Sequence, residues 1–122
     1  MVIVLPVLDE DYVLRRVPTF LPNYIKPDGT ISSLAFNLKK NEDGLSVDLE
    51  RLSSFEKATL GRTDFRLLKL NCGEIRNEIN DGIDVIHNPV EGNYAHSLIT
   101  GKITRGKQKQ LVKISKEIDE SN

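Results

Sequence analysis

The stretch Gly29–Leu52, with the sequence GTISSLAFNLKKNEDGLSVDLERL, decides how the rest of the chain is interpreted. Two of its segments have strand-like composition, Ile31–Leu38 and Leu45–Leu49, and the charged, glycine-containing sequence NEDG separates them. This pattern predicts a β-hairpin. Apolar and polar residues alternate in the second segment, so Ser46 and Asp48 are expected together on the polar face of an antiparallel strand. The core face of the first segment is expected to hold Ser32, Leu34, Phe36 and Leu38.

Further strands are predicted on both sides of this hairpin. The β-branched start Val2–Leu8 is either an edge strand or an extended lead-in, and the edge is favoured because Pro6 removes a backbone donor. Three prolines make Pro18–Pro27 an ordered loop. Alternation or apolar runs predict the remaining strands at Tyr12–Val17, Phe65–Leu70, Ile83–His87 and Tyr94–Thr100.

Three helices are expected between and after these strands. Ser53 and Glu56 have the spacing of a capping box, which predicts a short helix to Leu60, and Asn71-Cys72-Gly73-Glu74 repeats that spacing before about two helical turns. Leu111, Ile114 and Ile118 recur at helical spacing from Lys107 onward, which predicts a C-terminal amphipathic helix, with a strand over 111–114 as the alternative. The predicted fold class is therefore α+β, with a mainly antiparallel sheet of four to six strands.

Length and composition indicate the broad class of protein. A chain of 122 residues fits a single domain, here 1–122, and its net charge of −1 gives no global attraction to nucleic acid or membrane. One cysteine, Cys72, excludes an intrachain disulfide and suits a cytoplasmic location. The apolar start MVIVLPVL is shorter than a membrane span and is followed by acidic residues, so no targeting segment or membrane contact is expected.

One group of side chains has the composition of a polar site. It comprises Arg15, Arg16, Ser32, Ser33, Ser46, Asp48, His87 and His96. A serine, a histidine and Asp48 are the residue types of a nucleophilic triad, and His96 and Ser46 are the candidate catalytic residues. The favoured alternative is that the hydroxyl groups bond to nearby backbone, because no Gly-x-Ser-x-Gly elbow is present.

Two further chemical hypotheses are weaker than their structural alternatives. His87, His96 and Glu91 could supply three metal ligands around a proline turn, but histidines bonded to backbone are favoured and no metal or cofactor is expected. Cys72 at a helix start could be a reactive thiol, but a small buried packing residue is favoured.

The segment 102–116 is basic and contains no acidic residue. Its cations could bind phosphates of nucleic acid, although a solvated helix face is favoured because no aromatic residue interrupts the run to stack on bases. The candidate nucleic-acid contacts are Lys102, Arg105, Lys107 and Lys109, followed by Lys113 and Lys116.

Four segments together resemble a group of small bacterial proteins known mainly as uncharacterised open reading frames. The segments are LRRVP at Leu14–Pro18, ISSLAF at Ile31–Phe36, GLSVDL at Gly44–Leu49 and NPVEGNYAHSLITG at Asn88–Gly101. The resemblance covers about Leu14–Ile118, implies a C-terminal helix and singles out Arg15 or Arg16, Ser32 or Ser33, Ser46 and His96. A weaker likeness is to small ADP-ribosyltransferase-type domains, which hold a dinucleotide with a strand arginine and serine; their Glu-x-Glu or Gln-x-Glu element is missing here.

The leading functional hypothesis is a small cytosolic bacterial or phage accessory protein that binds a nucleotide or another phosphate-bearing molecule in a polar pocket. Arginine would hold the phosphate, Ser33 and Ser46 would orient it, and His96 would exchange a proton. One alternative is a non-enzymatic module that meets a partner protein or nucleic acid through the basic segment. Another is a component of a toxin–antitoxin pair.

Overall fold

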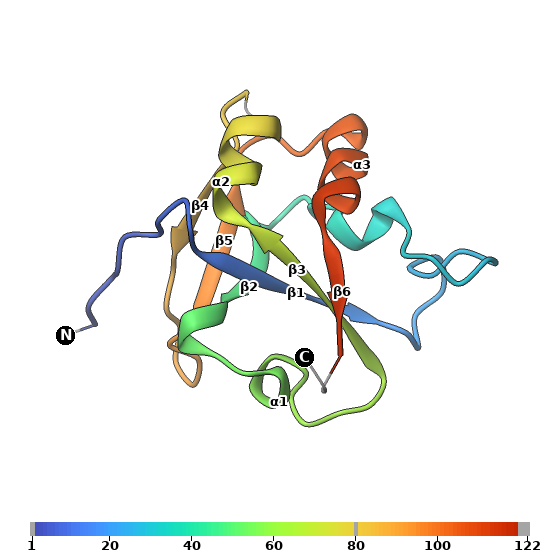
Figure 1. The fold of residues 1–122 in the computed structure, drawn as a ribbon, viewed down its shortest axis with the longest axis horizontal. Helices are drawn as coiled ribbons and strands as arrows, with labels where there is room; N and C mark the ends of the chain where they lie inside the picture. Colours follow the sequence, from blue (N-terminus) through green and yellow to red (C-terminus); the bar gives the residue numbers. More distant parts are fainter. Residues whose placement is uncertain (1, 80, 120–122) are drawn as a thin grey trace.

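The structure, a computed structural model, describes residues 2–79 and 81–119. These residues form an α+β fold around one six-stranded sheet with strand order β4-β5-β2-β1-β3-β6, in which every neighbouring pair is antiparallel (Figure 1). The strands are β1 (Tyr12–Pro18), β2 (Leu45–Leu49), β3 (Phe65–Asn71), β4 (Asp84–His87), β5 (His96–Thr100) and β6 (Lys116–Ile118).

The two faces of the sheet are covered unequally. One face packs against α2 (Cys72–Glu74), η3 (Ile75–Ile79), α3 (Arg105–Ile114) and the 3₁₀ turn η1 (Ser33–Phe36), and it holds the larger core. The other face carries a small apolar cluster of Leu14, Ala58 and Leu67 under α1 (Phe55–Ala58). Figure 1 shows α2 and α3 on one side of the sheet and α1 on the opposite side. The second face, called the open face below, therefore leaves room for polar side chains.

The prediction of a strand at Ile31–Leu38 is wrong, and with it the hairpin to β2. Ser32 accepts a hydrogen bond from the Leu34 N–H and caps the 3₁₀ turn η1, which places Ala35 and Phe36 in the core. Serine side chains compete for backbone groups in this way and so favour caps over strand interiors. β2 pairs instead with β1 and β5.

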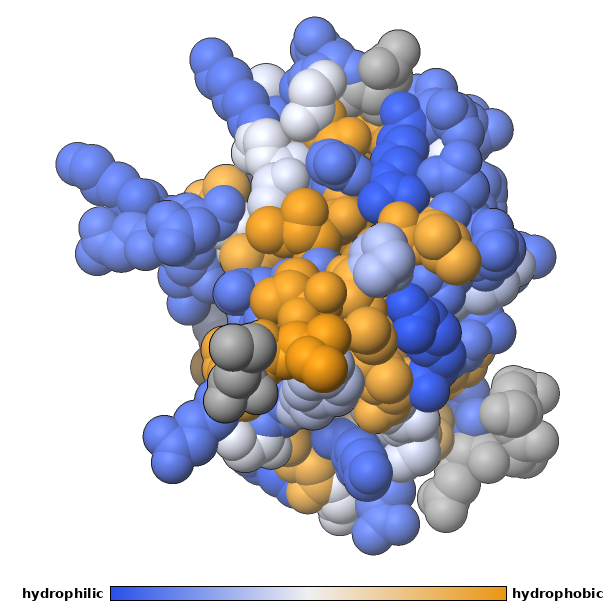
Figure 2. Space-filling view, turned by 90° about the vertical axis from the view of Figure 1, so that its left-hand side faces the viewer, coloured by the Kyte–Doolittle hydropathy of each residue, from blue (hydrophilic) through white to orange (hydrophobic). Residues whose placement is uncertain are grey.

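Val2–Leu8 is an extended lead-in rather than an edge strand. The Leu5 N–H donates to His87 Nδ1 at 2.8 Å, and the Tyr94 hydroxyl donates to the Ile3 carbonyl at 2.7 Å. Side chains rather than a backbone ladder thus hold the segment beside β4. Figure 2 shows apolar residues gathered on this side of the molecule. In the lead-in and β4, the apolar residues Val2, Ile3, Val4 and Ile86 are exposed.

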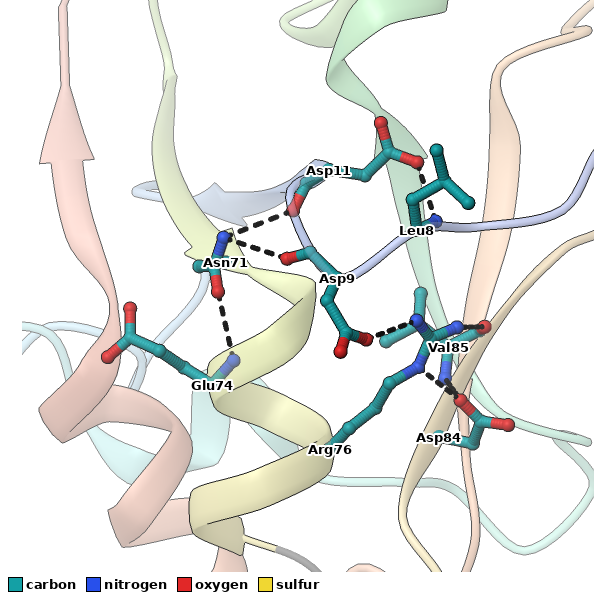
Figure 3. Close-up of polar contacts among 8 residues, drawn as sticks. All are labelled: Leu8, Asp9, Asp11, Asn71, Glu74, Arg76, Asp84 and Val85. Atoms are coloured by element: carbon teal, nitrogen blue, oxygen red, sulfur yellow. Dashed lines mark hydrogen bonds and ion pairs between the residues drawn. The ribbon is translucent and has the colours of Figure 1, made fainter.

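The lead-in is also joined to the helical layer through charged groups. Arg76 on η3 forms ion pairs with Asp9 and Asp84 at 2.9 and 2.7 Å and donates to the Val85 carbonyl (Figure 3). Burial alone would raise the pKa of Asp84, but hydrogen bonds from Arg76 and from the Val85 N–H outweigh it and lower that pKa. Arg76 therefore satisfies the Val85 carbonyl of β4, the strand at the edge of the sheet.

The helix predictions hold with shifted boundaries. The side chain of Ser54, not Ser53, caps α1 by accepting from the Lys57 N–H. Asn71 caps α2 as predicted, and the helix continues as the π turn η3. The C-terminal helix α3 ends at Ile114, where Ser115 caps it, and the chain then forms β6 beside β3. The segment 111–118 therefore contains both a helix and a strand.

Among residues 2–79 and 81–119, no helix has the length and apolar character that crossing a bilayer requires.

Candidate functional site

A small polar hollow lies on the open face where β1, β2 and β5 run side by side. It has a volume of about 40 Å³ and is lined by Leu14, Arg16, Ser46, Val47, Asp48, Asn93 and His96. Strand register explains the grouping, because Asp48 is the partner of Leu14 on one side and of His96 on the other. Alternation along β2 then places Ser46 on the same face as Asp48.

Ser46 and His96 are within hydrogen-bonding distance of each other. His96 Nε2 lies 3.2 Å from Ser46 Oγ, and His96 Nδ1 lies 2.8 Å from the Asn88 carbonyl oxygen. A carbonyl can only accept, so Nδ1 carries a proton and, in the neutral ring, Nε2 accepts from the serine hydroxyl. The geometry is that of a hydroxyl next to an oriented base.

Asp48 does not complete a Ser-His-Asp arrangement. Its carboxylate accepts from Asn93 Nδ2 at 2.8 Å, whereas the group that orients the His96 ring is the Asn88 carbonyl. Asp48 is buried and lines the hollow, so its carboxylate is a hydrogen-bond acceptor there. The carboxylate, hydroxyl and imidazole are neighbours but do not form a nucleophilic triad, which was the less favoured hypothesis from the sequence.

The two consecutive arginines of β1 point to opposite faces. Arg16 lines the hollow, donates from Nη1 to the Ala58 carbonyl at 2.6 Å, and lies over the Phe65 ring at 5.3 Å. Arg15 lies on the core side, where it donates to the Ala35 and Ser46 carbonyls at 2.9 and 2.7 Å. Burial lowers the pKa of Arg15. Arg15 thus ties η1 to β2 and does not reach the hollow.

Ser32, Ser33 and His87 are also outside the hollow. Ser32 caps η1, and Ser33 lies in the same turn, which packs against α3 on the opposite face. The His87 ring is buried between the Leu5 N–H and the Tyr94 carbonyl, with its nitrogens 2.8 and 2.6 Å from them. His87 therefore links the lead-in to the turn 88–95 through its two ring nitrogens.

The metal hypothesis built on His87, His96 and Glu91 is not supported by the geometry. Both histidine rings are engaged by backbone groups. Within the described part of the chain, no group of three or more His, Cys, Asp or Glu side chains is placed to hold a metal ion.

Cys72 is fully buried at the start of α2. Burial raises the pKa of its thiol to about 12. Desolvation raises this pKa by more than the positive charge of Arg76 lowers it. The thiol therefore packs in the core as an apolar group.

We expect the Cys72 thiol of the folded protein to resist alkylation. With an unfolded thiol pKa near 8.5, the raised value predicts labelling by iodoacetamide that is about a thousandfold slower in the folded protein at mildly alkaline pH. Mass spectrometry measures the rate before and after denaturation, and Cys72 is the only cysteine in the sequence, so each sample is its own control. Equal rates in the two states would contradict this burial.

The basic segment is not one continuous cationic surface. Lys107 is buried, and its ammonium group contacts the Lys102 carbonyl at 3.1 Å and the Asp81 carboxylate at 3.1 Å. It joins the start of α3 to the turn before β4. The remaining cations of the segment are exposed, namely Lys102, Arg105, Lys109, Lys113 and Lys116.

Asn93 is the polar lining residue that sequence reasoning missed. Its amide bonds to Asp48, and its side-chain oxygen accepts from the Ala95 N–H at 3.2 Å, which fixes the turn before β5. Asparagine in a Gly-Asn turn is common for backbone reasons alone. Because Asp48 lies 45 residues from Asn93 in the sequence, no local sequence pattern indicates their contact.

Compared with protein-family models, with curated proteins and with solved structures, the chain matches none of them.

Proposed function

We propose that the open-face hollow binds the phosphate group of a small organic ligand. The observation that carries this proposal is that Arg16, Ser46 and His96, from three different strands, line one hollow. The Arg16 guanidinium donates to phosphate oxygens directly, and protonation of His96 at Nε2 would turn that nitrogen into a second donor and release the Ser46 hydroxyl to act as a third. A guanidinium has five N–H donors, and Arg16 uses one of them on Ala58, so donors are left for a ligand.

The size of the hollow limits what enters it. A volume of about 40 Å³ is far below the roughly 300–1,000 Å³ of ordinary small-molecule sites, so only a group of a few atoms fits inside. A phosphate head group would be held there while the rest of the ligand lies outside.

Asp48 favours a ligand that also carries hydroxyl groups. A carboxylate repels a free anion, but it accepts hydrogen bonds from sugar hydroxyls, as acidic residues do for ribose in dinucleotide sites. Arg16 and Asp48 together therefore favour a sugar phosphate or a nucleotide over inorganic phosphate. His96, with Nδ1 held by the Asn88 carbonyl, would exchange a proton with the ligand or with Ser46 through Nε2.

We expect Ser46→Ala and His96→Ala to weaken the binding of ribose 5-phosphate or a nucleoside monophosphate about tenfold or more, since each removes a hydrogen bond to a charged group. Isothermal titration calorimetry measures affinity, and circular dichroism checks folding. Ser33→Ala is the matched control, because Ser33 lies on the other face and should leave affinity unchanged. Absence of binding to the wild-type protein, or full affinity in Ser46→Ala, would refute the proposal.

A second candidate is a non-enzymatic module that contacts nucleic acid or a partner protein through α3. The observation that favours it is the four-residue spacing of Arg105, Lys109 and Lys113, all exposed. Truncation cannot test it, because Leu111 of α3 is fully buried in the core. Binding of nucleic acid or of a partner protein should then weaken steeply as the salt concentration rises. If Lys109→Gln abolishes this binding and Ser46→Ala does not, this candidate is favoured over the first.

A further inference from the structure

A second depression opens next to the hollow and shares a wall with it. It is a groove of about 650 Å³, between residues 52–61 and the turn 92–95. Asn93 lines both the hollow and the groove, so the two lie next to each other at this residue. The volume lies within the usual range of small-molecule sites. Its apolar lining residues are Leu52, Leu60, Tyr94 and Ala95, and its polar ones are Ser54, Glu56, Lys57 and Asn93.

Leu60 has an unusual backbone conformation for its residue type. Its φ is 59°, in the left-handed region, where a bulky side chain is an outlier. The α1 terminus explains the conformation, because the Gly61 N–H bonds to the Glu56 carbonyl and the Leu60 N–H to the Lys57 carbonyl. Helix ends of this kind usually have glycine at this position, yet here a leucine that is 60% exposed lines the groove. The helix end therefore does not require a large apolar side chain at this position.

Tyr94 lines the other side of the groove, and two contacts hold its side chain in place. Its hydroxyl donates to the Ile3 carbonyl at 2.7 Å, and its ring meets the His87 ring edge-on with centroids 4.9 Å apart. The residue is nevertheless 43% exposed. An aromatic surface held at two points loses little conformational entropy when a ligand packs on it.

We infer that the groove binds the base of a nucleoside monophosphate whose phosphate lies in the hollow, an inference that rests on the proposed function above. A nucleobase is flat and largely apolar with polar edges, which matches a groove that combines Leu60 and Tyr94 with Ser54 and Lys57. The sugar of the ligand would lie over Asn93, between the hollow and the groove, next to the Asp48 carboxylate to which Asn93 bonds.

The test compares ribose 5-phosphate with the four common nucleoside monophosphates by calorimetry. We expect at least one nucleotide to bind tenfold or more tightly than ribose 5-phosphate. Leu60→Gly should weaken the binding of that nucleotide at least fivefold and leave the affinity for ribose 5-phosphate unchanged. The melting temperature of this variant should stay the same or rise, because glycine adopts a positive φ without strain. Loss of binding with no loss of stability cannot be attributed to misfolding.

Asn23→Gly is the matched control, since Asn23 also has a positive φ of 74° and does not line the groove. It should leave both affinities unchanged. Nucleotides that bind no more tightly than ribose 5-phosphate, or full nucleotide affinity in Leu60→Gly, would overturn the inference while leaving the phosphate site intact. If ribose 5-phosphate and all four nucleotides fail to bind, the proposed function itself fails.

Discussion

Replacing Phe36 with alanine should lower the free energy of unfolding by about 3–5 kcal/mol, the usual cost of removing a buried aromatic ring. Phe36 is fully buried, belongs to the main core, and lies 6.0 Å from the Arg15 guanidinium. Its loss would leave a cavity between η1 and the sheet that the neighbouring elements can fill only in part. Urea denaturation followed by circular dichroism measures the change.

Leu34→Ala is the control that tests whether this segment forms a 3₁₀ turn or a strand. In a strand, Leu34 and Phe36 would share the core face and both substitutions would be costly. In the turn, Leu34 is only partly buried and lies outside both core clusters, so its replacement should cost far less. Similar losses for the two variants would contradict the structure of this segment.

The second large effect is expected at Gly101, which follows β5. Its φ is 111°, and an added Cβ would lie 2.7 Å from the Gly82 carbonyl oxygen and 2.8 Å from the Ile83 side chain. Gly101→Ala should therefore destabilise the protein by about 2–5 kcal/mol, from a strained backbone and a clash with main-chain atoms. Thermal and urea denaturation measure the loss.

Gly92→Ala provides the matched comparison. Gly92 also has a positive φ, of 83°, but nothing lies within 4 Å of an added Cβ there. Only the backbone penalty remains, about 1 kcal/mol or slightly more. The difference in stability between the two variants therefore measures the effect of the close contact between Gly101 and Gly82. Equal losses of stability would show that the protein accommodates a Cβ at position 101 without a clash.

These contacts give physical roles to three residues of the segment His96–Gly101, which has the sequence HSLITG. His96 faces the hollow, Ile99 is fully buried in the main core, and Gly101 permits the chain to pass close to the turn before β4. The three positions therefore differ in what they do. Only His96 has a side chain that could contact a ligand.

Local patterns were sufficient for most strands. Leu45–Leu49 was predicted with the bounds that β2 has, and Tyr12–Val17 and Phe65–Leu70 each fall one residue short of β1 and β3. Alternation and apolar runs are properties of neighbouring residues, so they remain readable in one sequence. Ile31–Leu38 also alternates, but the Ser32 cap and the burial of adjacent Ala35 and Phe36 override that pattern.

The candidate site was predictable only in part. Ser46, Asp48, His96 and Arg16 were named from their residue types, and the fold brings them to one hollow. Arg15, Ser32 and Ser33 were named on the same grounds, but they lie on the opposite side of the sheet or in the η1 turn. Residue type does not distinguish these two groups.

The sequence by itself determined the class of fold, the position of most strands and the pairing of Ser46 with Asp48 on one face, because each depends on residues close together in the chain. Only the tertiary structure decided that His96 meets Ser46, that Arg16 rather than Arg15 joins them, and that Asn93 holds Asp48. Sheet order and register bring these side chains together, and both depend on burying core residues that are far apart in sequence.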